Sequence, residues 1–169
     1  MALPLVMILG IASQLIVGQL LDAARYDIGG SPALAQATQS LADAERSLQQ
    51  AVGRLATPLA FPANGCSDGL CANRQAPASE SYDWQKGSAH ANVPGSAAAG
   101  YWIEALGVLS AGQSVNCPGD TGGCEYVRVI ASAAAGETRR SLDACYRIRR
   151  TAGSAPSIMR ISWRQLHLP

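Results

Sequence analysis

The sequence predicts an α+β fold in which a long N-terminal helix, apolar in its first half, packs on a four-stranded antiparallel sheet. The first 21 residues carry no charged side chain, leucines then recur every seven residues, and the C-terminal part contains segments in which apolar and polar residues alternate. The chain has 169 residues, of which 48% are hydrophobic, and a net charge of +1. These values fit one domain with an appendage and exclude a disordered chain.

Residues 1–28 are predicted to form a transmembrane or filament-core helix. A helix over Met1–Leu21 would be about 32 Å long, roughly the thickness of a hydrocarbon core. No Lys or Arg precedes Arg25, which is unlike a secretory signal peptide. Gln14 and Gln19 indicate that this helix also packs against other protein. A plain N-terminal membrane anchor is the alternative interpretation.

Residues 29–57 are predicted to form an amphipathic helix of the globular domain. Gly29 and Gly30 interrupt the preceding helix, Ser31 can cap the next one, and Pro32 suits its first position. The heptad leucines are Leu34, Leu41, Leu48 and Leu55. Such a stripe can indicate a coiled coil. Because alanines lie between the leucines, we expect close packing against the core of the domain.

Residues 58–169 are predicted to contain a loop-rich region followed by the sheet. The segment 58–100 is rich in Pro, Gly, Ala, Ser and Asn and is interpreted mainly as loop. The four strand candidates are residues 101–106, 126–131, 145–150 and 157–164. Strict alternation in the last of them would place Trp163 on the opposite face from Arg160. One apolar and one polar face describe an antiparallel sheet covered on one side, with the amphipathic helix as its cover.

The five cysteines suggest two short disulfide loops. Cys66 with Cys71 and Cys117 with Cys124 are close in sequence, so each pair can close locally in an oxidising compartment. Cys145 remains, either as a buried thiol or as a partner for Cys117 or Cys124. No metal site is expected, because the pairs lack C-x-x-C spacing and neither histidine lies in a ligand motif.

The end of the chain is strongly basic. Residues 139–169 contain seven arginines and one acid, Asp143, a net charge of +6. A basic face of Arg147, Arg149, Arg160 and Arg164 could bind an acidic partner or nucleic acid. Nucleic acid is only weakly supported, because exposed aromatic residues are not interleaved with the arginines. A solvated sheet face is the alternative. No catalytic motif and no phosphate- or dinucleotide-binding glycine pattern is present, so neither an enzyme nor a cofactor is expected.

Four segments together resemble a known family. They are Ala35–Glu45 on the amphipathic helix, Asp68–Cys71, Tyr101–Gly107 and Cys145–Ile148. In order and spacing the chain resembles PilX-type minor pilins of the bacterial type IV pilus, over nearly its whole length. The resemblance implies a pilin-like fold and a structural subunit that primes pilus assembly at or near the filament tip. Such a subunit supports adhesion and twitching motility.

The resemblance also implies a location, partners and a modification. The domain would be periplasmic while the helix sits in the inner membrane, and the subunit would then enter the extracellular pilus. Its partners would be other minor pilins, the major pilin and a large tip adhesin. The mature N-terminus of such pilins is methylated. The implied assembly helix includes Met1, Leu3, Pro4, Leu5, Val6, Leu9 and Leu15.

Leu5 stands where most pilins carry a glutamate if Met1 is the mature N-terminus. That glutamate is thought to neutralise the amine of the subunit ahead, since an unpaired buried charge is costly. A subunit without it would suit the distal position of the filament or its priming complex. Alternatively, Leu5 marks a subunit used at low copy number. Two other functions stay open: a GspK-like minor pseudopilin of type II secretion, and a membrane-anchored periplasmic binding module.

Overall fold

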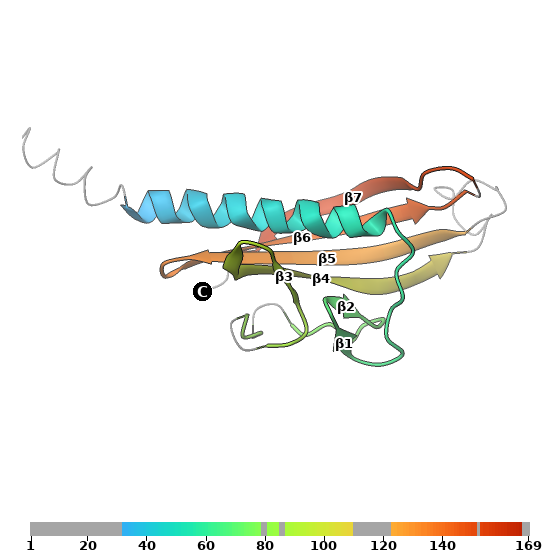
Figure 1. Ribbon diagram of the computed structural model, residues 1–169, viewed down its shortest axis with the longest axis horizontal. Coiled ribbons are helices and arrows are strands. Elements are labelled where there is room, and N and C mark those ends of the chain that lie inside the picture. The colour runs from blue at the N-terminus through green and yellow to red at the C-terminus, as the bar shows by residue number, and fades with distance from the viewer. Residues whose placement is uncertain (1–31, 79–80, 85–86, 110–122, 152, 167–169) are drawn as a thin grey trace, which may run out of the picture. The chain divides into compact units, whose positions relative to one another are not determined.

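A computed structural model describes residues 32–78, 81–84, 87–109, 123–151 and 153–166 (Figure 1). The chain divides into two units, Met1–Gln36 and Ala37–Pro169. Of the first unit, residues 32–36 are described, and they begin a helix that runs over residues 32–55. No helix within the described ranges is long and apolar enough to cross a membrane. The segment 1–28, for which a transmembrane helix is predicted, lies outside the described residues.

A sheet of seven strands forms the body of the second unit. Its strands are β1 (Cys66–Ser67), β2 (Leu70–Cys71), β3 (Ala91–Val93), β4 (Ser96–Leu109), β5 (Cys124–Ala135), β6 (Thr138–Arg149) and β7 (Ser157–Leu166). Their order is β1-β2-β4-β5-β6-β7, with β3 also paired to β4. The pairing of β2 with β4 is parallel and the others are antiparallel, so the sheet is mixed.

The predicted fold class, a pilin-like α+β fold with a four-stranded antiparallel sheet, is therefore wrong. The described part of the chain is mostly β, and its one helix has 24 residues and is amphipathic rather than apolar. The additional strands come from the segment 58–100, which is interpreted as loop in the sequence. Short strands there are held by a disulfide and by pairing to β4, and such strands are too short to show an alternating pattern.

The helix lies lengthwise along one face of the sheet and buries mainly small residues (Figure 1). Ala44 and Ala51 are fully buried beside Leu48 and Leu55. They pack on a core contributed largely by Val127, Val129, Ala131, Ala133, Leu142, Ala144 and Ile148. Alanine on both sides lets the helix approach the strands closely, so an added methyl group there would disturb the packing and lower the stability of the fold.

Two serines of the same helix face are buried without losing their hydrogen bonds. Ser40 Oγ donates to the Ala37 carbonyl at 3.0 Å, and Ser47 Oγ donates to the Asp43 carbonyl at 2.8 Å. Bonding back to the preceding turn satisfies the hydroxyls inside the core. The buried stripe therefore combines serine and alanine with leucine, and Leu34, at the start of the heptad pattern, is 67% exposed.

Arg150 fixes the C-terminal end of the helix to the sheet. Its Nη2 donates to the carbonyls of Leu55 at 3.1 Å and Thr57 at 2.8 Å, and its Nε contacts Glu125 at 3.3 Å. These carbonyls have no partner further along the helix, and a cation is favoured at a helix C-terminus. One side chain thus connects the helix end, β5 and the loop after β6.

The β1–β2 hairpin is closed by a disulfide and a tight turn. Cys66 and Cys71 are bonded, which confirms that predicted pair. Asp68 and Gly69 form the turn with φ angles of 49° and 72°, a conformation typical of a two-residue Asp-Gly hairpin loop. A Cβ at residue 69 would lie 2.6 Å from the Cβ of Ala91, so the position also requires glycine for space.

An aromatic cluster covers the other face of the sheet at the β3 end of β4. Trp84 stacks on Trp102 with ring centroids 4.5 Å apart, and Tyr82 meets both rings edge-on. Tyr82 Oη is 2.9 Å from His90 Nδ1. Trp84 and Trp102 are almost fully buried. The sheet is therefore covered on both faces at this end, whereas the sequence suggests one covered face.

We predict that Ala44→Leu lowers the free energy of unfolding by about 1–3 kcal/mol, because the added carbons must fit between the helix and the sheet. Ala42→Leu is the matched control, since Ala42 is exposed on the same helix. Chemical denaturation of both variants measures the difference. Equal stability of the two variants would contradict close packing of the helix on the sheet.

Candidate functional site

The edge strand β7 is the most exposed long strand of the described sheet. Its outer edge has no paired strand among the described residues. Met159, Ile161 and Trp163 expose 52%, 55% and 46% of their surface. Large apolar side chains on an open strand edge favour contact with another chain.

A β-bulge in β7 determines which side chains share a face. Cys145 of β6 pairs with Ser162, but the next residue, Tyr146, pairs with Arg160, so Ile161 is the extra residue. Without the bulge, Arg160 and Trp163 would point to opposite faces, as strict alternation predicts. With it, both lie on the face that carries the helix.

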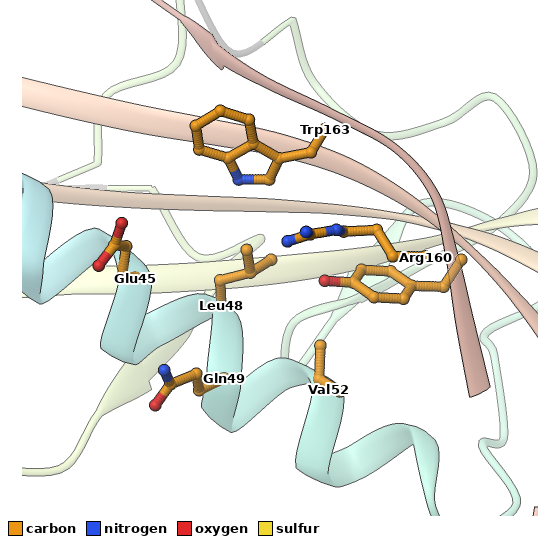
Figure 2. Close-up of a pocket in the computed structure, with 7 residues that line it drawn as sticks. Glu45, Leu48, Gln49, Val52, Arg160 and Trp163 are labelled. Atoms are coloured by element: carbon orange, nitrogen blue, oxygen red, sulfur yellow. The ribbon is translucent and has the colours of Figure 1, made fainter. Parts of the chain in front are cut away.

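Arg160 and Trp163 form one wall of a groove between β7 and the helix. The groove has a volume of about 590 Å³ and is lined by Glu45, Leu48, Gln49, Val52, Tyr146, Arg160 and Trp163. Figure 2 shows Arg160 extending from β7 toward Leu48 on the helix, with the Trp163 ring beside it. An apolar floor with a few charged groups at its rim is typical of a site that binds a side chain or a peptide.

The charges in the groove are unpaired. Within the described residues, neither Glu45 nor Arg160 forms an ion pair. Arg160 interacts with the Tyr146 hydroxyl. Burial raises the pKa of Tyr146, and the charge of Arg160 and its hydrogen bond offset only part of that rise. Among the described residues, Arg160 thus has a phenol hydroxyl but no carboxylate as its partner.

On the opposite face, an ionic network holds β7 to the sheet. Arg128 donates from Nε and Nη2 to the two carboxylate oxygens of Asp143, each at 2.9 Å. Arg164 of β7 donates from Nε and Nη2 to Asp143 Oδ2 at 2.9 and 2.7 Å. Arg128 Nη1 also lies 3.8 Å from Glu104 Oε2. The network crosses β4, β5, β6 and β7, and bidentate pairing of this kind is geometrically specific.

The two central members of this network have shifted pKa values. Burial of Asp143 would raise its pKa, but the hydrogen bonds and charges of Arg128 and Arg164 outweigh burial and hold the pKa below the ordinary value. The hydrogen bonds to Asp143 raise the pKa of Arg128 despite its partial burial. Both groups therefore stay charged at neutral pH.

Cys145 is half-buried and is the free cysteine of the described residues. It lines a second cavity of about 460 Å³ with Arg128, Asp143, Ser162, Trp163 and Arg164. Cys124 is disulfide-bonded, and its predicted partner Cys117 lies outside the described residues. Within the described ranges, no group of three or more His, Cys, Asp or Glu side chains could hold a metal ion.

The structure divides the predicted basic face. By the strand register, Arg147, Arg149 and Arg164 lie on the face away from the helix, whereas Arg160 lies on the helix side. Arg147 Nη2 contacts Met159 Sδ at 3.4 Å. The predicted assembly-helix residues, from Met1 to Leu15, lie outside the described residues.

Sequence reasoning missed the groove and the network. Glu104 and Arg128 each interrupt an otherwise apolar strand segment, and that interruption is a signal from which a buried ion pair could have been inferred.

Comparison of the chain with protein-family models, curated protein sequences and solved structures gave no match.

We predict that Asp143→Asn lowers the free energy of unfolding by about 2 kcal/mol at pH 7, because hydrogen bonds to a charged group are lost. The folded pKa of Asp143 is depressed, so its contribution is complete above the unfolded pKa and disappears as the pH falls through the folded pKa. The difference from wild type should therefore shrink in acid. Glu137→Gln, at an exposed position, should show no such pH-dependent difference in denaturant melts. A deficit of Asp143→Asn that stays constant with pH would contradict this account.

Proposed function

We propose that the chain is a minor subunit of a type IV pilus, or of a closely related filament, that acts by docking onto neighbouring chains. The helix over residues 32–55 carries the proposal. It follows a segment with 21 uncharged residues, and within Ala37–Pro169 it buries one stripe of small residues against the sheet. A helix attached to its domain in this way can connect that domain to an apolar assembly segment. The sequence resemblance to PilX-type minor pilins also supports it, with Ala35–Glu45 of this helix among the resembling segments.

The cysteines support a location outside the cytosol. Cys66 is bonded to Cys71, and Cys124 is also in a disulfide. Disulfides form and persist in the periplasm and on cell surfaces. We therefore place the domain in the periplasm before assembly and in the filament afterwards, with other minor pilins, the major pilin and a tip adhesin as partners.

We expect Leu9→Glu to remove the subunit from filaments, because a charge in the uncharged segment opposes burial in lipid or in a filament core. Ala42→Glu adds the same charge at an exposed helix position and should leave incorporation unchanged. The measurement is immunoblotting of sheared filaments and of membranes from cells that make the tagged chain.

Either of two results would contradict the proposal. The first is a wild-type chain that stays in the membrane fraction without any pilin partner, as expected of an anchored binding module. The second is a Leu9→Glu variant that enters filaments as well as the wild-type chain does.

A further inference from the structure

β7 exposes large apolar side chains on both faces of the sheet. Met159 lies on the face with Arg147, whereas Trp163 lies on the helix face beside Arg160. Open strand edges are usually protected by charges or bulges. Here the bulge at Ile161 instead brings an aromatic side chain and a cation together on the wall of a groove.

The charge along β7 is entirely positive. The strand contains Arg160 and Arg164 and no acidic residue. Arg164 forms an ion pair with Asp143, although its side chain is largely exposed. Arg160 has no ion pair among the described residues. A segment that approaches this edge meets the two arginines of β7, while the carboxylate of Glu45 lies on the helix side of the groove. Carboxylates of the segment are therefore favoured on the β7 side, next to Arg160.

From these observations we propose that β7 binds an extended acidic segment of another protein. The segment pairs with the outer edge of β7, places an apolar side chain in the groove against Trp163 and Leu48, and presents a carboxylate to Arg160. Strand addition supplies main-chain hydrogen bonds, and side chains on one face of the added strand supply specificity.

An extended segment fits both exposed faces of β7. Successive side chains of an added strand point to opposite faces, so it can cover Trp163 on one face and Met159 on the other. A helix laid in the groove would contact the helix-side face alone and would leave the Met159 side uncovered. The added strand has to span the bulge: regular pairing is expected along Ser162–Leu166, and an irregular step at Ile161 brings the strand alongside Arg160 and Met159.

A second copy of the chain is disfavoured as the occupant. Two β7 strands paired edge to edge would bring Arg160 and Arg164 of both copies to one interface, and neither strand contributes an acidic residue there. Like charges gathered at one interface are destabilising. The same charges attract a strand that carries Glu or Asp, so the partner is a different, acidic chain.

The test uses the full-length chain in detergent micelles and two eight-residue peptides, a Val-Glu peptide with the repeat Val-Val-Glu-Glu and a Val-Lys peptide with the repeat Val-Val-Lys-Lys. In either peptide, each face of the added strand carries both apolar and charged side chains. Trp163 is 46% exposed, whereas Trp84 and Trp102 are 6% and 0% exposed, so a blue shift of tryptophan emission reports docking at β7. We expect the Val-Glu peptide to bind at least about tenfold more tightly than the Val-Lys peptide, and less tightly at high salt.

Two variants locate the binding. Arg160→Glu should weaken binding of the Val-Glu peptide by at least about tenfold, while Arg74→Glu, at an exposed position after β2 and far from β7 in the strand order, should change it little. Trp163→Phe should remove the emission shift, and calorimetry should show weaker binding, because the groove loses part of the apolar surface that receives the side chain of the peptide. Near-ultraviolet circular dichroism checks that each variant is folded.

Equal affinity for the two peptides, or an unchanged affinity of Arg160→Glu, would overturn the inference, as would tighter binding of an acidic helical peptide. The inference deepens the proposed function by naming the chemistry of a partner. The binding inference rests on the proposed function in one respect: the acidic segment is expected to come from a neighbouring chain of the filament. Failure to bind peptide would leave incorporation into filaments unaffected, so the two proposals fail separately.

Discussion

A single helix has to cover a sheet that is wider than itself. A helix with its side chains is about 10 Å across, whereas neighbouring strands are about 4.8 Å apart, so one helix covers two or three strands. In this chain the helix lies over the centre of the sheet, where small residues of both layers meet. The strand at the β7 edge is left partly uncovered, and the groove beside it follows from this difference in width.

The two faces of the sheet are held together by different interactions. On the helix face, stability comes from the burial of apolar side chains and from Arg150, which anchors the helix end. On the other face, an aromatic cluster covers one end, and the network around Asp143 crosses four strands. Arg164 ties β7 down from this second face, while on the helix side Ile158 packs against the core and Trp163 stays largely exposed.

Part of this arrangement could be predicted from the sequence. Three strand candidates lie within β4, β5 and β7, and the candidate 145–150 overlaps β6 except for its last residue. The helix over residues 32–55 lies within the predicted segment 29–57. These elements are long enough for their apolar residues to show a period. The Cys66–Cys71 disulfide was also predictable, since its partners are close in the chain. The strands within 58–100 were not, because two or three residues cannot show a period.

The groove could not be predicted from the sequence, because it depends on a β-bulge. Strict alternation in residues 157–164 places Arg160 and Trp163 on opposite faces, and only the bulge at Ile161 brings them together. A bulge leaves little trace in a sequence, because it depends on the pairing of a neighbouring strand. The same is true of the network, in which Arg128 and Asp143 lie on different strands and meet only through the register.

The most direct test of the account is a set of nuclear Overhauser effects from Arg160 and Trp163 in the full-length chain. If the bulge is as described, both side chains show contacts to helix-face residues of β6, Trp163 to Ala144 and Arg160 to Tyr146. If β7 alternates strictly, only one of them does, and the other shows contacts to residues of the opposite face such as Arg147. That result would remove the groove and the binding site built on it.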